Sequence, residues 1–275
     1  MGHGRAHIEE ESFFVSMTDI MVGLLFIFIM IIMYFALQAK IDEQKIITQE
    51  VTIGLLRKGQ SNGAEFEKLT SYQRQVAQQR MLLLGWIKLE LEQDGILGVE
   101  VIEDQGILRL PEGILFDSNQ FNVSEGTNAY NTASSLSNAL ATVLPCSVLN
   151  ADGEPLIPVL ICELSLHHNI NGAFIKGIYI EGHTDNDPVP PTGLLADPRI
   201  DSNLKLAARR STNTLERLQN ENPQLVDYFG PSYIGNSLVF EPILASSAYG
   251  QLRPSVENSD ETNKKINRRI DLKVE

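Results

Sequence analysis

The chain has 275 residues, of which 43% are apolar, 35 are acidic and 22 are basic, and its formal net charge is -13 at pH 7. This length and apolar content suffice for the core of one large or two small domains, so the chain is neither disordered throughout nor a small disulfide scaffold. A strongly acidic protein repels phosphate backbones, which argues against direct nucleic-acid binding.

One apolar block dominates the N-terminal part of the sequence. Residues 20–37 read IMVGLLFIFIMIIMYFAL, 18 residues without a charge, and as a helix they cover roughly 27 Å, close to one bilayer core. We therefore predict a transmembrane helix at residues 13–38 after a short tail at residues 1–12. The alternatives are a cleaved signal peptide, which needs a basic start and a shorter apolar stretch, and a buried soluble helix.

The charges around this block disagree with the orientation that we adopt below. Arg5 is the only strongly basic side chain before the block, whereas Lys40, Lys45, Arg57 and Lys58 follow it. Charge counting places the more basic flank in the cytoplasm, although a long folded domain is translocated largely regardless of such counts. The sequence leaves this conflict open.

Residues 39–94 are predicted to form a helical linker. The segment is rich in Gln, Lys, Glu and Leu and is interrupted by GQSNG at residues 59–63. Over residues 64–93, apolar residues recur mostly three to five positions apart, which is typical of one helical face. Such a helix either packs on the following domain or pairs with a second copy, and too few clean heptads are present to claim a coiled coil.

From residue 95 onward the pattern changes to short strands and helices. Runs at 99–103 and 107–110 flank a turn sequence and predict a hairpin. Further elements are expected at about 127–144 (helix), 178–182 (strand), 202–220 (helix) and 270–274 (strand). A polar stretch around 145–177 looks inserted. The alternation predicts an α+β fold for residues 95–275, an α/β sandwich with helices packed on a mixed sheet.

Four ordered motifs in this domain resemble the OmpA-like peptidoglycan-binding family. They are FDSNQ at 116–120, IEGHTDN at 180–186, the helix that carries Asn203, Leu206 and Arg210, and NRRID at 267–271. With one apolar span and an aspartate at its start, the chain resembles the B subunits of ion-driven stators related to flagellar MotB. More narrowly, SMTDIMVGLLFIFIMIIMYFALQ at residues 16–38 resembles the B subunit of the Zorya anti-phage defence system, and the short acidic tail favours this relative.

The resemblance implies a bacterial inner-membrane protein with a cytoplasmic N-terminus and a periplasmic C-terminal domain. It implies a homodimer within a pentameric ring of a multi-span A subunit, since one helix cannot enclose an ion path. The expected function is that of the peptidoglycan-anchored B subunit of a proton-driven rotary motor for anti-phage defence. The alternatives are a flagellar-type stator subunit and a passive cell-wall tether.

Asp19, at the start of the apolar block, is the expected ion carrier. A carboxylate at the edge of hydrocarbon must be paired, hydrated or protonated, and intramembrane ionisable residues are functional by default. Ser16 and Gly23 share its helical face and would supply a hydroxyl and a smooth surface for a neighbouring helix. The alternative is that Asp19 or Thr18 only caps the helix. We expect H+ as the transported ion, with Na+ as the alternative, and no cofactor.

The family motifs assign ligand binding to Asp185 and Arg210. Peptidoglycan stems contain a diamino acid with an ammonium and a carboxylate, which together require an acceptor and a bidentate cation. Asp185 would accept from the ammonium and Arg210 would clamp the carboxylate. Asn203 and Leu206, on the same helical face, would orient the ligand, and Thr184 would add a hydrogen bond. The alternative is a structural ion pair between Asp185 and Arg210.

Departures from the family pattern leave some assignments open. The chain has LAARRS at 206–211 where the family usually has LSxxRA, so Arg209 is a rival of Arg210. Of Arg268 and Arg269, one is expected to face the pocket and the other solvent, and we include Arg268 among the binding residues. The Pro-rich loop at 187–202 is longer than expected and would cover the pocket or change which muropeptide fits.

Cys146 and Cys162 flank the inserted segment. As a disulfide they would stabilise the domain by about 3 kcal/mol in an oxidising compartment. The alternative is a pair of reduced buried thiols.

Neither a metal site nor a catalytic site is predicted. His183 and Asp187 are the nearest metal candidates, but no second His, Cys or Glu lies at metal-ligand spacing. The adjacent His167 and His168 point in different directions in either regular structure. Because no catalytic triad order, phosphate-binding glycine loop or pair of carboxylates stands out either, we expect no enzyme.

Overall fold

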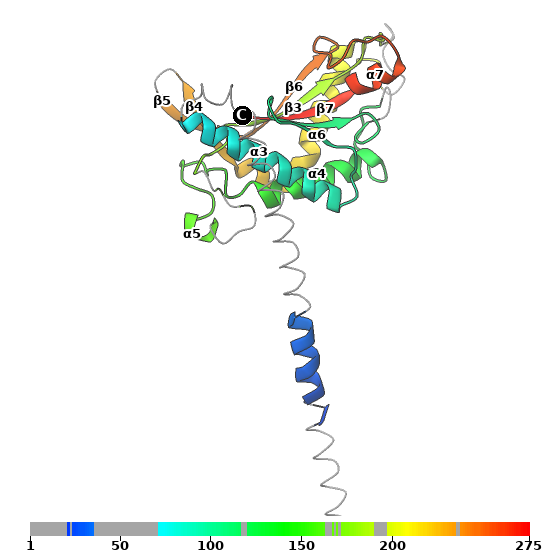
Figure 1. Cartoon of the computed structure of the whole chain (residues 1–275). Helices are drawn as coiled ribbons and strands as arrows, with labels where there is room; N and C mark the ends of the chain where they lie inside the picture. The colour runs from blue at the N-terminus through cyan, green and yellow to red at the C-terminus, as the bar shows by residue number, and fades with distance from the viewer. Residues whose placement is uncertain are drawn as a thin grey trace, which may run out of the picture. The chain divides into compact units, whose positions relative to one another are not determined.

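The computed structural model (Figure 1) describes residues 21–22, 24–35, 71–116, 120–162, 167, 169, 172–189, 197–234 and 237–275. The chain divides into two compact units, Met1–Glu50 and Val51–Glu275. In the first unit, residues 24–35 are helical and their large apolar side chains are exposed. Within the described residues, no helix is both long and apolar enough to cross a membrane. The predicted ion carrier Asp19 lies outside the described residues, as do Ser16, Thr18 and Gly23.

The second unit alternates helices and strands. Its elements are α3 (Ser71–Gln93), β1 (Glu100–Ile102), β2 (Ile107–Pro111), α4 (Asn128–Val143), α5 (Val159–Cys162), β3 (Ile178–His183), α6 (Asn203–Glu221), the 3-10 helix η1 (Pro223–Asp227), β4 (Phe229–Ile234), β5 (Ser237–Pro242), β6 (Leu244–Gly250), α7 (Glu261–Asn267) and β7 (Arg269–Val274). The elements predicted between residues 99 and 274 are present, each with ends within one residue of the prediction. Six further elements, α5, η1, β4, β5, β6 and α7, were not predicted.

The central sheet has five strands in the order β1-β2-β7-β3-β6. β3 and β6 are parallel and are joined through α6, whereas the other neighbours are antiparallel. The sheet is therefore mixed, as predicted. β4 and β5 form a separate two-stranded antiparallel sheet.

One face of the central sheet is apolar and carries the core. Because side chains alternate along a strand, Ile180 of β3 and Leu272 of β7 point to the same side, and both are fully buried. Figure 1 shows α3, α4 and α6 together on one side of the sheet. Leu82 and Trp86 of α3 belong to this core. The helix assigned to the linker therefore packs on the domain through this end of α3.

Gly182 lets α6 lie directly against β3. A Cβ atom at this position would lie 2.2 Å from the backbone oxygen of Ala207, far inside contact distance. The missing side chain thus brings the start of α6 close to the end of β3, where the second sequence motif lies.

The inserted segment is anchored to the domain at both ends. Cys146 and Cys162, whose bonding the sequence left open, form a disulfide with a Cα–Cα distance of 5.6 Å. The backbone of Leu149 pairs with that of Phe229 at the start of β4, and the side chain of Ile175 is buried in the core. The insertion thereby supports the edge formed by β4.

Candidate functional site

Asp185 lies just beyond the end of β3, where the chain leaves the sheet. Its carboxylate is buried, with a side-chain exposure of 8%. Oδ1 accepts a hydrogen bond of 3.1 Å from the backbone N–H of Asp187, and Oδ2 accepts one from Arg268. The hydroxyl of the buried Thr184 donates to the carbonyl oxygen of Asp185 at 3.0 Å. The backbone and Arg268 together fix the direction of this carboxylate.

Arg268, the predicted binding arginine, is surrounded by three carboxylates. Besides Asp185, its guanidinium pairs with Glu261 of α7, and its Nε lies 2.6 Å from Oε1 of Glu112. Burial lowers the pKa of Arg268, but the hydrogen bonds to Glu112, Glu261 and Asp185 outweigh burial and leave the pKa raised. The group therefore stays charged, and the carboxylates around it outnumber its single positive charge. Sequence reasoning missed Glu112, which directly follows β2 and meets Arg268 only in the folded domain.

Arg210 and not Arg209 faces the interior of the domain. Arg210 is 3% exposed on the buried side of α6, whereas Arg209 is exposed. The Nε of Arg210 donates to the carbonyl oxygen of Gln120 at 2.7 Å, and its guanidinium carbon lies 5.5 Å from the centre of the Phe116 ring. Arg210 thus connects α6 to the first sequence motif, of which residues 117–119 lie outside the described residues.

Asn203 joins the start of α6 to the Asp185 loop. Its side-chain nitrogen donates to the carbonyl oxygen of Asp185 at 3.1 Å, to that of Asp187 at 2.9 Å and to Oε1 of Gln251 at 2.7 Å. Ser202 caps the helix by accepting from the backbone N–H of Lys205. The cap and the amide together hold the first turn of α6 against the end of β3.

Leu206 forms an apolar wall between Asn203 and Arg210. It packs with Phe121, Val189 and Ile200 in a small cluster separate from the main core. Asn203 and Arg210 are seven positions apart in α6, which corresponds to roughly 10 Å along the helix axis. One face of α6 therefore presents an amide, an apolar wall and a guanidinium in succession.

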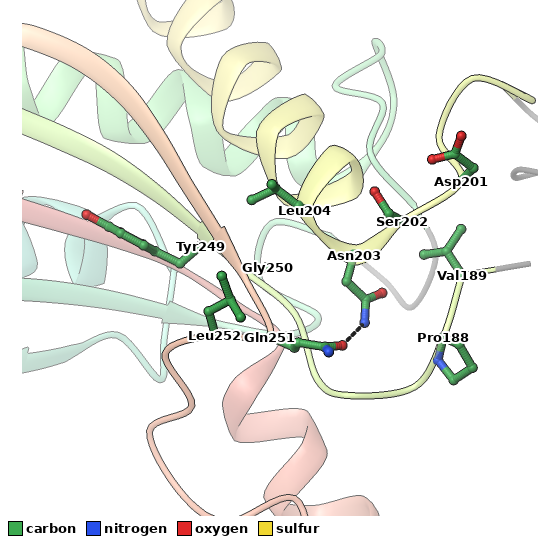
Figure 2. Close-up of a pocket in the computed structure, with 10 residues that line it drawn as sticks. All are labelled: Pro188, Val189, Asp201, Ser202, Asn203, Leu204, Tyr249, Gly250, Gln251 and Leu252. Atoms are coloured by element: carbon green, nitrogen blue, oxygen red, sulfur yellow. Dashed lines mark hydrogen bonds between the residues drawn. The ribbon is translucent and has the colours of Figure 1, made fainter. Parts of the chain in front are cut away.

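A pocket of about 350 Å³ opens beside Asn203. Figure 2 shows its walls, which come from the start of α6, the residues at and after the end of β6, and the first part of the Pro-rich loop. Gly250 has φ +55°, and a Cβ there would lie 3.0 Å from the backbone nitrogen of Leu204, so the two segments approach closely. Pro188 and Val189, from the described start of the long loop, line the pocket, while residues 190–196 lie outside the described part of the chain.

Arg269 points to the opposite face of the sheet from Arg268, and because both side chains are buried, the prediction that one of the two faces solvent is wrong. Arg269 is 6% exposed, its Nε donates to Oδ2 of Asp271 at 2.9 Å, and its Nη2 donates to the carbonyl oxygen of Arg253 at 3.1 Å. Burial lowers the pKa of Arg269. Neighbouring residues at the start of a strand point to opposite faces, which separates Arg269 from Arg268.

Neither histidine candidate, His183 or His167, lies in a metal-binding cluster among the described residues. Among the described residues, no cluster of three or more His, Cys, Asp or Glu side chains could hold a metal ion. His183 is buried on the face opposite the helices and stacks on Tyr249, whereas its suggested partner Asp187 is exposed and pairs with Lys264. His167 lies 3.5 Å from Glu90, and His168 lies outside the described residues.

Comparisons with known proteins give only distant likenesses. No protein-family model and no curated protein sequence matches the chain. A solved structure of a MotB-like protein from Desulfovibrio vulgaris is similar, with 18% identity over 74% of this chain and 98% of that chain and a TM-score of 0.48. The periplasmic domain of Helicobacter pylori MotB is similar with 20% identity, coverage of 61% and 74%, and a TM-score of 0.36. The cell wall anchor of the type VI secretion system (T6SS) from Pseudomonas aeruginosa is similar with 16% identity, coverage of 69% and 94%, and a TM-score of 0.41. Because these sequence identities and TM-scores are low, the function must be argued from the motifs and the geometry of the site.

Proposed function

We propose that the domain at residues 71–275 binds peptidoglycan and anchors the chain to the cell wall. The observation that carries the proposal is the succession of the buried Asp185 carboxylate, the apolar wall at Leu206 and the buried Arg210 guanidinium around one face of α6. A diamino acid of the peptidoglycan stem presents an ammonium, an aliphatic chain and a carboxylate, which these three features complement.

The charge balance around Asp185 favours a cationic ligand group. Asp185, Glu112 and Glu261 together surround the single guanidinium of Arg268. Asp185 and Glu112 are the buried members, with side-chain exposures of 8% and 11%, whereas Glu261 is exposed. Because buried charges are stable only when they are paired, an arriving ammonium would supply a second positive charge for these two buried carboxylates. Arg268 accordingly holds Asp185 in place for the ligand.

Binding of the purified full chain to muropeptides that contain diaminopimelate tests this proposal. Asp185→Asn and Arg210→Gln each remove one charge-assisted hydrogen bond, so each should weaken binding about ten- to a hundredfold. Arg209→Gln is the matched control, because it removes the same charge from the exposed neighbour in the same helix and should leave binding unchanged. Full binding by a folded Asp185→Asn variant would contradict the proposal.

The N-terminal block is proposed to span the inner membrane, with the N-terminus in the cytoplasm and the domain in the periplasm. Support comes from the uncharged run at residues 20–37 and from the exposed apolar side chains of helical residues 24–35. The Cys146–Cys162 disulfide favours an oxidising compartment for the domain and so counts against the orientation from charge counting. Labelling of a cysteine introduced at Glu257 with a membrane-impermeant maleimide in spheroplasts tests this topology, and protection from the reagent would contradict it.

For the assembled protein we propose the role of B subunit in a proton-driven motor for anti-phage defence. A dimer of this chain would sit within a ring of multi-span A subunits, with Asp19 as the carrier of H+ and Na+ as the alternative ion. The carboxylate at the start of the apolar block and the ordered motifs support this role.

Phage challenge of a strain with Asp19→Asn tests the motor, with Glu10→Gln as a control that removes a carboxylate outside the block. We expect loss of protection only with Asp19→Asn. Unchanged protection would leave a passive tether, and failure to co-purify a multi-span partner would contradict the motor. A swimming defect without a defence defect would indicate the flagellar-type alternative.

A further inference from the structure

Strand β6 forms one edge of the central sheet (Figure 1), and it lacks the usual protection against pairing with another strand. Its sequence, LASSAYG, contains neither a charge nor a proline over seven residues. The strand at the other edge, β1, has only three residues and begins with Glu100. Proteins keep sheet edges from pairing by means of short strands, charges and prolines. By this criterion β1 is a protected edge, whereas the outer side of β6, which we call the β6 edge, is free to pair.

The backbone groups of β6 point alternately to β3 and to the β6 edge. Ile178 of β3 donates to the carbonyl oxygen of Ile243 at 2.6 Å. In the parallel ladder that follows, Ala245 therefore turns its N–H and C=O groups to β3, whereas Ser246 and Ala248 turn theirs outward. Within the described part of the chain, no backbone group bonds to those of Ser246 or Ala248. The β6 edge thus presents donors and acceptors that a further strand would satisfy.

The helix above the β6 edge carries two opposite charges without partners. Arg209 and Glu216 of α6 are both exposed, and neither forms an ion pair with a described residue. They lie seven positions apart on one side of the helix, roughly 10 Å along its axis, so they are too far apart to pair with each other. An antiparallel second α6 would bring Arg209 of each helix beside Glu216 of the other. The charges of this surface are therefore complementary to those of a second copy of the chain.

The side of α6 next to the β6 edge has room for a second helix. A Cβ atom at Gly250 of β6 would lie 3.0 Å from the backbone nitrogen of Leu204, so the side of α6 that carries Leu204 is the side nearest β6. Ala208, Thr212 and Leu215 continue this side at helical spacing, and all three are uncharged and only partly buried. No charge on this side would oppose the approach of a second copy.

We propose that the β6 edge and the adjoining side of α6 bind a second copy of this chain across a twofold axis. In the symmetric arrangement, β6 pairs antiparallel with β6 of the other copy and is centred on Ser246. Every outward N–H of one strand then meets an outward C=O of the other. The two central sheets become one continuous sheet. The inference rests on the dimer in the proposed function and gives that dimer a surface.

The two copies of α6 fit the same axis. α6 approaches the backbone of β3 at Gly182 and that of β6 at Gly250, so it lies over both strands. A twofold axis just outside β6 then separates the two helices by about two strand spacings, or about 10 Å. This separation matches the interaxial distance of roughly 8–10 Å at which helices pack. Strand pairing and helix packing therefore agree on one geometry.

Disulfide cross-linking of the full chain in membranes tests the interface. Ser246 would lie opposite Ser246 of the other copy, with Cα atoms about 5.5 Å apart, which is within the range of roughly 4.4–6.8 Å for disulfides. Because Cys146 and Cys162 are bonded to each other, an introduced cysteine supplies the only thiol. Ser246→Cys should give a covalent dimer under mild oxidation, and Ser237→Cys, at an exposed serine of β5, about tenfold less. Equal yields from both variants would overturn the interface.

A charge exchange separates a specific interface from random collision. In the Ser246→Cys chain, Arg209→Glu places like charges opposite each other and should slow cross-linking about three- to tenfold. Addition of Glu216→Arg brings opposite charges together again and should restore the rate. Arg74→Glu is the matched control, because it makes the same change at an exposed position of α3. Failure of the exchange to restore the rate would overturn the antiparallel arrangement of α6.

Two further measurements distinguish failure of the interface from failure of the proposed function. If two differently tagged copies co-purify but Ser246→Cys gives no covalent dimer, the copies meet elsewhere and the β6 interface is overturned. If no second copy co-purifies, the dimer of the proposed function is overturned with it. Ser246→Pro removes only an outward N–H, which a sheet edge tolerates, so this variant should bind muropeptides as the unmodified chain does. Loss of muropeptide binding by the folded Ser246→Pro variant would overturn the separation of the two surfaces.

Discussion

The two faces of the central sheet are stabilised in different ways. The face toward α3, α4 and α6 is apolar, and Ile180, Ile270 and Leu272 are almost completely buried there. The opposite face, which we call the charged face, carries a buried network of Arg109, Glu181, His183, Arg269 and Asp271. The first face gains stability from non-directional burial, whereas the second depends on each charge meeting a specific partner.

The candidate site lies where these two faces end. Asp185 follows β3 two residues after His183 of the charged face, and Arg268 directly precedes Arg269 of the same face. In β3, His183 pairs with Arg269 of β7 in register. The strand ends that present Asp185 and Arg268 are therefore positioned by helix packing on one side and by the charge network on the other.

The strongest test of the helix side is Gly182→Ala. The new Cβ would lie 2.2 Å from a backbone oxygen of α6, which cannot rotate away as a side chain does. We expect the free energy of unfolding to fall by more than about 4 kcal/mol, because losses of this size arise when a substitution forces a severe steric conflict in the core. Gly177→Ala is the control, since its nearest neighbour is a side-chain atom of Tyr179 at 3.3 Å. Urea unfolding measures both, and equal losses would refute the close approach of α6 to β3.

The charged face is tested by Asp271→Asn. Asp271 accepts from Nε of Arg109 at 3.0 Å and from Nε of Arg269 at 2.9 Å, and it is 1% exposed. Removal of its charge leaves two buried guanidinium groups without their carboxylate, so we expect a loss of about 3–5 kcal/mol in urea unfolding. Glu275→Gln, which affects the more exposed pair with Lys273, should change stability by about 0–1 kcal/mol. A loss near 1 kcal/mol for Asp271→Asn would show that the charged face contributes no more than surface pairs.

The contrast between the faces also explains how far the sequence could predict this fold. The apolar face produces alternation that is visible in the sequence, and the strands at β1, β2, β3 and β7 were predicted within one residue. β4 was missed because FGPSYI contains Gly and Pro, and β6 was missed because LASSAYG is rich in small and polar residues. α7, with seven residues, is too short for helical periodicity to be recognised.

For the site, the sequence motifs predicted single residues but not the partners that surround them in the structure. The motifs predicted Asp185, Asn203, Leu206 and Arg210, and the structure places all of them around the first turns of α6 and the end of β3. The motif spacing contained no information about Glu112, which reaches Arg268 from an element far away in sequence. Long-range ion pairs depend on tertiary packing, which a single sequence does not display.

Away from both faces, the disulfide of the insertion should have a smaller and separate effect. Joint Cys146→Ser and Cys162→Ser removes a cross-link between positions 16 apart, which should lower the unfolding free energy by about 3 kcal/mol. The measurement is urea unfolding of the oxidised protein and the double variant. Because the insertion is not part of the candidate site, muropeptide binding by the folded double variant should persist, and a loss of binding would place the insertion in the site.

The smallest expected effect concerns the cap of α7, the helix that leads into Arg268. Asp260 accepts a hydrogen bond of 2.9 Å from the backbone N–H of Asn263, and this bond, with a second one from Ser259, lowers the pKa of the carboxyl group below its ordinary value. Since the folded pKa lies below the unfolded pKa, the stabilisation is present above roughly pH 4 and is lost as the pH falls through the folded pKa.

Asp260→Ala should therefore lower Tm slightly at pH 7, and the Tm difference between this variant and the unmodified chain should shrink toward pH 2. Asp260→Asn keeps a capping oxygen without a charge and should show a Tm difference that is small at pH 7. If the Tm difference of Asp260→Ala stays constant from pH 7 to pH 2, the ionised cap does not stabilise the helix that positions Arg268 beside Asp185.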